Sequence, residues 1–123
     1  MYEFSTFKAC TGLLLRNDEG KVLHGRNLDF EMWELFSKLV VNVEYYNGNT
    51  KVFTVDTVAG SVFALTGVRH GAFSVNVDTR KAKDFSQDLI SILAKQAYPT
   101  VWLLRRVLED QANYKDAANR LKT

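Results

Sequence analysis

The period of the apolar residues changes near residue 84, and this change limits the folds that the chain can adopt. Over residues 73–77 apolar and polar side chains alternate, which is typical of a strand with one buried face. Beyond residue 84 the apolar side chains recur at the spacing of amphipathic helices. The sequence therefore predicts one α+β domain in which an antiparallel sheet is followed by helices.

Two turn sequences predict two β-hairpins in the first part of the chain. One contains Asn17 and Gly20, and the other contains Asn47 and Gly48, which are residue types that favour tight turns. Strands are expected in sequential antiparallel order, in one sheet or in part of a sandwich, over residues 9–16, 21–27, 39–46, 51–58, 61–65 and 72–77. The run from Leu13 to Leu15 indicates that both faces of the first strand are buried.

Helices are expected over residues 84–123. Their apolar stripes are Phe85, Leu89, Ile92 and Leu93, then Val101, Leu104, Val107 and Leu108, and finally Ala117, Ala118 and Leu121. Pro99 suits a first helical turn, and Asn113 suits the N-cap of the last short helix.

The charge balance and the hydropathy exclude several classes of function. A net charge of +2, from 16 basic and 14 acidic residues, gives no strong electrostatic footprint for nucleic acid, so no nucleic-acid partner is expected. No apolar run approaches the length of a membrane span, and residues 1–4 do not read as the start of a signal peptide. A single cysteine is compatible with any redox compartment.

Cys10 is the only cysteine, so it is either a buried apolar side chain or a reactive thiol. The first hairpin would bring Arg26 back towards the Cys10 end of the partner strand, and Asp29 follows shortly after. A cation and a carboxylate suit a thiol that must be activated, because the thiolate is the nucleophile. The alternative for Arg26 and Asp29 is an ordinary surface ion pair.

His24 and His70 are the candidate bases for such a thiol. On a strand, His24 shares a face with Arg26, so it reaches the thiol only if the register of the hairpin allows it. A structural or surface role is the alternative for either histidine.

One motif gives a specific family resemblance. It consists of Cys10-Thr11 followed by His24-Gly25-Arg26-Asn27-Leu28-Asp29-Phe30. This motif resembles the acid ceramidase and N-acylethanolamine acid amidase family of N-terminal-nucleophile hydrolases, in the choloylglycine-hydrolase-like superfamily. Further landmarks follow in order over residues 65–67, 73–75, 78–80, 98–105 and 114–122. The resemblance implies the N-terminal part of the catalytic domain and part of the four-layer αββα fold.

The resemblance also implies a mechanism, in which the precursor cuts itself just before the cysteine. Cys10 is then the nucleophile of amide hydrolysis, and its own α-amine is the general base, since the unperturbed pKa of such an amine is about 7.7–8.0. Arg26 would hold the cysteine and bind the carbonyl side of the substrate, and Asp29 would orient and tune the amine. No metal and no cofactor is implied.

The expected substrate and location also come from the resemblance. The substrate would be a lipid amide, with Met32, Trp33 and Phe36 as an acyl-chain wall, unless these side chains only pack in the core. A lysosomal or secretory location is implied. Peripheral contact with a membrane is compatible with this, as is a second chain or propeptide subunit that completes the fold.

The chain departs from the family pattern at both ends and at two internal positions. Residues 1–9 are expected to be a residual propeptide tail and residues 10–123 an incomplete N-terminal-nucleophile hydrolase domain. Maturation would require cleavage of the Ala9–Cys10 bond, and the family's downstream Asn and Arg lie beyond the last residue. Thr79 stands where family members commonly carry Glu, and Gly12 stands where they carry Ser.

Three functions therefore remain open at the level of sequence. The leading prediction is a hydrolase of fatty-acyl amides of the N-acylethanolamine or ceramide type. The second is a truncated, catalytically incomplete relative that acts as a binding or regulatory protein. The third is a bile-salt or penicillin-type amide hydrolase, because the Cys10-Thr11-Gly12 sequence echoes those enzymes.

Overall fold

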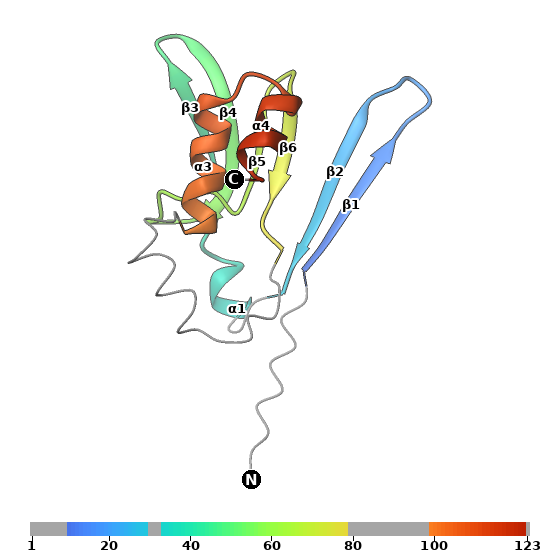
Figure 1. Ribbon diagram of the computed structural model, residues 1–123. Coiled ribbons are helices and arrows are strands. Elements are labelled where there is room, and N and C mark those ends of the chain that lie inside the picture. The colour runs from blue at the N-terminus through green and yellow to red at the C-terminus, as the bar shows by residue number, and fades with distance from the viewer. Residues whose placement is uncertain (1–9, 30–32, 79–98, 123) are drawn as a thin grey trace.

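The computed structural model describes residues 10–29, 33–78 and 99–122 and confirms an α+β fold with antiparallel sheets and helices (Figure 1). The strands are β1 Cys10–Arg16, β2 Val22–Leu28, β3 Val40–Asn47, β4 Thr50–Val58, β5 Thr66–Arg69 and β6 Phe73–Asn76. The helices are α1 Trp33–Phe36, α3 Thr100–Asp110 and α4 Tyr114–Arg120. The helix expected around Phe85 to Leu93 lies outside the described residues.

The described strands form two antiparallel sheets rather than one. β1 and β2 form a separate hairpin, and the other sheet has the order β3-β4-β5-β6. Both predicted hairpin turns are confirmed, because Gly20 and Gly48 adopt φ values of 82° and 60°. These left-handed conformations cost little for glycine, which has no Cβ atom. The turns therefore fix the registers of the two hairpins.

The prediction of a strand over residues 61–65 is wrong, since the strand begins only at Thr66. The preceding segment is a polar loop. The Thr57 hydroxyl lies 2.7 Å from the Ser61 hydroxyl and donates to the Phe63 carbonyl at 3.0 Å. These side-chain bonds satisfy polar groups that a ladder would otherwise pair. The next strand in the sheet is therefore β5, which pairs with β4 on one side and with β6 on the other.

The core lies between the four-stranded sheet and the two C-terminal helices. Its buried apolar residues are Phe53, Val55, Ala64, Phe73, Leu104, Val107, Leu108 and Ala117. Gly67 allows α3 to approach β5, because a Cβ atom there would lie 2.4 Å from Leu108 Cδ1. Arg69 holds the end of the same helix by donating to the carbonyls of Leu108 and Glu109.

The helix predictions are largely confirmed. α3 follows Pro99, as expected, and Leu104, Val107 and Leu108 of its stripe are buried. Asn113 caps α4 by accepting a hydrogen bond from the Asp116 backbone at 3.0 Å. The expectation that Leu121 turns inward is wrong, because this side chain is 40% exposed. No helix in the described part of the chain is long and apolar enough to cross a membrane.

The β1–β2 hairpin stands against the sheet on the side of β6 and diverges from it towards its turn (Figure 1). It contacts β5 through Arg26 and β6 through His24, two side chains of β2. The three leucines of β1 are 53%, 66% and 53% exposed, so the prediction that Leu13 to Leu15 are buried on both faces is wrong for the described structure. The reason is that only one face of the hairpin contacts the sheet, through Arg26 and His24, and that the hairpin diverges from the sheet towards its turn (Figure 1).

Candidate active site

The side chain of Arg26 lies at the junction of the hairpin and the sheet. Its Nη1 atom donates to the Leu65 carbonyl at 3.2 Å and to the Thr66 hydroxyl at 2.7 Å. Its Nη2 atom donates to the Val77 carbonyl and lies 3.9 Å from Cys10 Sγ. A planar guanidinium suits this role, because its donors have fixed directions. Arg26 therefore connects the thiol to β5 and to the end of β6.

The hairpin register explains how Cys10 and Arg26 meet. Gly12 pairs with Arg26, and Cys10 pairs with Leu28, so Cys10 and Arg26 project from the same face of the hairpin. Gly12 lies directly opposite Arg26 on that face and has no side chain. The expectation that the turn brings Arg26 back to Cys10 is confirmed.

Apart from the sulfur atom of Cys10, the acceptors that the structure gives to Arg26 are neutral. They are two carbonyls and a hydroxyl, and no described carboxylate forms an ion pair with this side chain. The Nε atom is buried and has no hydrogen-bond partner among the described residues. The positive charge of Arg26 is therefore available to a thiolate, or to an oxyanion that forms beside it.

Asp29 follows the last residue of β2 and lines the same junction. Its Oδ1 atom accepts a hydrogen bond from Asn27 Nδ2 at 2.9 Å, and the side chain is exposed. Because Cys10 pairs with Leu28 in an antiparallel ladder, Asp29 lies on the backbone-nitrogen side of Cys10. The alternative role for Arg26 and Asp29 is a surface ion pair. No ion pair between Arg26 and Asp29 is present among the described residues.

The two histidines have partners of their own. His24 Nδ1 lies 2.8 Å from Ser74 Oγ on β6, and His70 Nε2 lies 2.7 Å from Thr54 Oγ1. His24 pairs with Leu14, which is about 13 Å along the strand from Cys10 at the usual rise per residue. The register therefore places His24 at the hairpin–sheet contact, where it has the structural role that the sequence left open.

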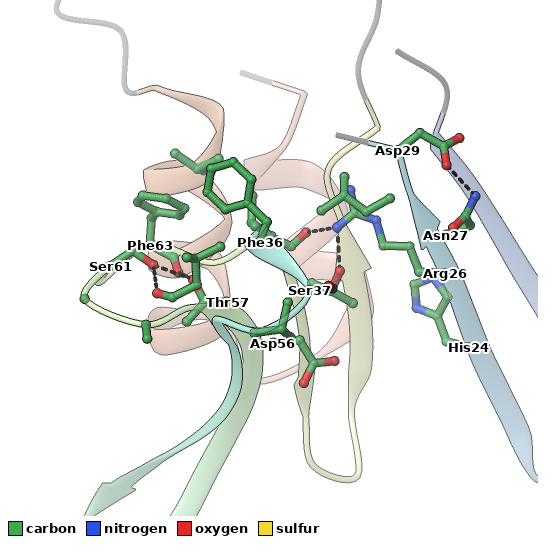
Figure 2. A pocket seen from close by; sticks show the side chains of 18 residues that line it. His24, Arg26, Asn27, Asp29, Phe36, Ser37, Asp56, Thr57, Ser61 and Phe63 are labelled. Carbon is green, nitrogen blue, oxygen red and sulfur yellow. Dashed lines mark hydrogen bonds between the residues drawn. The ribbon is translucent and has the colours of Figure 1, made fainter. Parts of the chain in front are cut away.

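A half-open cavity of about 1100 Å³ extends from this junction (Figure 2). Its polar wall includes Arg26, Asp29, Asp56 and Thr66, and its apolar wall consists of Leu28, Phe36, Val40, Val58, Ala59, Phe63, Leu65 and Val101. This volume is slightly above the usual range of small-molecule sites, about 300–1,000 Å³, and such sites are mostly apolar with a few placed polar groups. The junction therefore has the form of a binding site for a molecule with an apolar part and a polar part.

Of the three residues expected to contact the acyl chain, the structure describes the side chain of only one. Met32 lies outside the described residues, and Trp33 begins α1 without a described side chain. Phe36, at the end of α1, does line the cavity. Among the residues that sequence analysis did not assign to the site, Thr66 bonds Arg26 and Asp56 lines the cavity. In the described part of the chain no group of His, Cys, Asp and Glu side chains could hold a metal ion.

Comparison with known proteins identifies the family. Residues 10–123 match the family model for linear amide C–N hydrolases of the choloylglycine hydrolase family. The matched residues include both antiparallel sheets, and they include Cys10 and Arg26 at the junction of these sheets. The chain belongs to the choloylglycine hydrolase family of linear amide C–N hydrolases.

The chain is similar in sequence to two named relatives and in structure to one solved protein. The chain is 32% identical over 111 residues to the N-acylethanolamine-hydrolyzing acid amidase of Caenorhabditis elegans, covering 89% of this chain and 31% of the relative. It is 35% identical over 134 residues to the acid ceramidase of Bos taurus, covering 96% of this chain and 33% of the relative. The solved structure of a Caenorhabditis elegans N-acylethanolamine-hydrolyzing acid amidase ortholog matches with a TM-score of 0.75 at 30% identity, covering 93% of this chain and 48% of that chain.

The chain thus spans about a third of the length of these curated relatives and about half of the solved chain. The family resemblance that the motif around Cys10 and Arg26 predicts is confirmed by these matches.

Proposed function

We propose that Cys10 is the nucleophile of an amidase that hydrolyses fatty-acyl amides of the N-acylethanolamine or ceramide type. The observation that carries this proposal is the position of Arg26 Nη2, 3.9 Å from Cys10 Sγ, in a guanidinium whose other described acceptors are two carbonyls and a hydroxyl. The family match, which begins at Cys10, supports the same assignment.

In the proposed reaction, cleavage of the Ala9–Cys10 bond first converts the Cys10 backbone amide into an α-amine. That amine takes the thiol proton, and the sulfur attacks the carbonyl carbon of the substrate amide. The carbonyl oxygen gains negative charge, which the Arg26 guanidinium stabilises. The amine product leaves with the proton, and water then hydrolyses the thioester to release the fatty acid and restore the thiol.

Asp29 has a positioning role in this proposal. Its place on the backbone-nitrogen side of Cys10 suits a carboxylate that accepts a hydrogen bond from the new α-amine. Asn27 would hold that carboxylate in place through the 2.9 Å bond to its Oδ1 atom. Residues 1–9 would be the released propeptide tail, and residues 10–123 would belong to the hydrolase domain.

The apolar wall of the cavity supports an acyl chain as the bound group. Phe36 lies in this wall, and we assign Met32 and Trp33 of the same segment to substrate binding as well. A lipid amide substrate implies contact with the membrane surface that supplies it. Since the relatives are named as acid amidases and an acid ceramidase, we place the protein in a lysosomal or secretory compartment.

A bile-salt or penicillin-type amide is the second candidate substrate, and Gly12 is the observation that favours it. Gly12 continues the Cys10-Thr11-Gly12 sequence that echoes those enzymes, and a Cβ atom here would make only ordinary contact with Asn76 at 3.7 Å, so packing alone does not require the glycine. Substrate profiling of the full-length protein separates the candidates. Preferred hydrolysis of conjugated bile salts over N-acylethanolamines would favour the second one.

The nucleophile assignment is tested with a Cys10→Ala variant of the full-length protein. We expect this variant to lose both cleavage of the Ala9–Cys10 bond and hydrolysis of an N-acylethanolamine. Circular dichroism checks that the variant is folded. We expect an unchanged spectrum, because Cys10 is half-buried and lies outside the core. Hydrolysis at the wild-type rate by Cys10→Ala would refute the proposal. An intact bond and no hydrolysis in the wild-type protein would favour a binding or regulatory role instead.

A further inference from the structure

Asp56 places a second charge in the wall of the cavity. Its side chain lines the same cavity as Arg26 (Figure 2), and its Oδ1 atom accepts a hydrogen bond from Asn42 Nδ2 at 2.8 Å. Asn42 and Asp56 are paired across β3 and β4, so this bond holds the carboxylate against the sheet. No described lysine or arginine forms an ion pair with Asp56. The exposed carboxylate is therefore oriented by Asn42 and is not paired with a described cation.

The sheet register places Asp56 next to the residue that holds Arg26. Asp56 pairs with Thr66 across β4 and β5, and paired side chains on one face have Cβ atoms about 4.5–5.5 Å apart. The Thr66 hydroxyl in turn accepts the 2.7 Å hydrogen bond from Arg26 Nη1. One cross-strand step therefore separates the carboxylate from the group that binds the proposed catalytic arginine.

This placement decides which part of a substrate faces Asp56. Covering an ionised carboxylate with methylene groups removes it from water without a replacement partner, which is costly. The acyl chain is therefore expected along the apolar wall, which includes Val58 and Phe63. The polar amine part of the amide is left to occupy the space before Asp56, where a hydrogen-bond donor or a positive charge is a suitable partner.

We propose that Asp56 is a specificity-determining residue that selects amides whose amine part carries a hydrogen-bond donor, and most strongly an ammonium group. The proposal rests on the assignment of this cavity to an acyl-amide substrate. It concerns the part of the substrate that leaves the enzyme first, and it does not depend on which residue performs the attack.

The test is a binding measurement on the Cys10→Ala protein from which residues 1–9 have been removed, as in the cleaved form, so that the site is open but the substrate is not turned over. Three probes share one acyl chain and differ only at the end of the amine part, which is a methyl, a hydroxyl or an ammonium group. We expect the ammonium probe to bind about tenfold more tightly than the methyl probe, with the hydroxyl probe between them. Isothermal titration calorimetry at low and high salt gives the dissociation constants.

Two substitutions at Asp56 give the proposal a sharp outcome. Asp56→Asn keeps a side-chain oxygen for Asn42 and should bring the ammonium and hydroxyl probes to within about threefold of each other. Asp56→Lys should make the ammonium probe the weakest of the three while leaving the methyl probe unchanged. Glu44→Gln is the matched control, because Glu44 is an exposed carboxylate on β3 that does not line the cavity, and it should leave the order unchanged.

The inference is overturned if the three probes bind equally, if none binds, or if the ammonium preference survives in Asp56→Asn. Its failure is distinguishable from failure of the proposed function. A wild-type protein that binds the probes in the expected order but hydrolyses none of them would contradict the proposed amidase and retain the Asp56 subsite. Hydrolysis that requires Cys10 but proceeds equally for all three probes would support the proposed amidase and contradict the Asp56 subsite.

Discussion

The Nη2 atom of Arg26 lies 3.9 Å from the sulfur atom of Cys10, although sixteen positions separate the two residues in the sequence. The β1–β2 hairpin brings them to the same face, and contacts to β5 and β6 hold the guanidinium there. In this position a positive charge is available to the thiol and to the oxygen of a bound carbonyl group.

Substitution of Arg26 by lysine should lower kcat about 100-fold or more, because loss of one donor to an oxyanion costs on that order. Lysine keeps the charge but cannot reproduce the forked contacts to Thr66 and Val77. Steady-state kinetics of the full-length protein on an N-acylethanolamine measure the effect. Arg106→Lys on the exposed side of α3 is the control and should change kcat by less than twofold. A kcat within twofold of wild type for Arg26→Lys would remove Arg26 from the reaction.

Thr66→Val removes the hydroxyl that accepts from Arg26 while keeping the shape of the side chain. One net hydrogen bond is worth about 1 kcal/mol, so kcat should fall by about fivefold to tenfold as the guanidinium becomes less well held. Thr54→Val is the matched control on the neighbouring strand, since its hydroxyl contacts His70 instead. Equal kinetics of both variants would show that Thr66 does not position the arginine.

Gly67→Ala should destabilise the fold by about 1–3 kcal/mol, in the range of overpacking in a tight core. A Cβ atom at this position would lie 2.4 Å from Leu108 Cδ1 and 3.1 Å from Val55 Cγ1. Urea denaturation monitored by fluorescence measures the change in the free energy of unfolding. Gly25→Ala on β2 should be nearly neutral, because its nearest neighbour would be the Leu13 Cβ at 3.9 Å. A stable Gly67→Ala protein would mean that α3 does not pack on β5 in this way.

The pKa of Glu44 depends on two neighbours at the tip of the β3–β4 hairpin. A hydrogen bond from Lys51 Nζ at 2.5 Å, and then one from Tyr46 OH at 2.6 Å, lower the pKa of Glu44 below its ordinary value. A lowered folded-state pKa contributes stability above the unfolded pKa, and this contribution is lost as the pH falls through the folded value. The contribution is small because the pair is exposed to solvent.

Lys51→Gln should therefore raise the pKa of Glu44 towards its ordinary value, which NMR titration of the Glu44 side-chain carbon can measure. Lys115→Gln on α4 serves as the control and should leave this titration unchanged. An unchanged midpoint in Lys51→Gln would contradict the hydrogen bond between the two side chains.

The sequence predicts the hairpins well because their turns are local. Asn17 with Gly20, and Asn47 with Gly48, specify where the chain reverses, and reversal alone carries Arg26 back to Cys10. The family resemblance followed from residues on this same hairpin and is confirmed.

The parts that sequence reasoning missed depend on contacts between distant elements. The strand begins only at Thr66 because bonds from Thr57 to Ser61 and to the Phe63 carbonyl hold the preceding residues in a loop, and an apolar pattern over residues 61–65 contains no sign of those bonds. Asp56 and Thr66 joined the site only through the order of β4 and β5 in the sheet. A carboxylate on an alternating strand looks like any solvent-facing residue until the neighbouring strand is known.

The most direct test of the central claim is mass spectrometry of the full-length protein after a brief incubation with an N-acylethanolamine at acidic pH, followed by acid quenching and proteolysis. We predict a new amino-terminal peptide that begins at Cys10, and a fraction of it should carry the mass of the acyl group as a thioester. Hydrolysis of the amide by a protein whose Ala9–Cys10 bond is intact, or an acyl group found on another residue, would contradict the account.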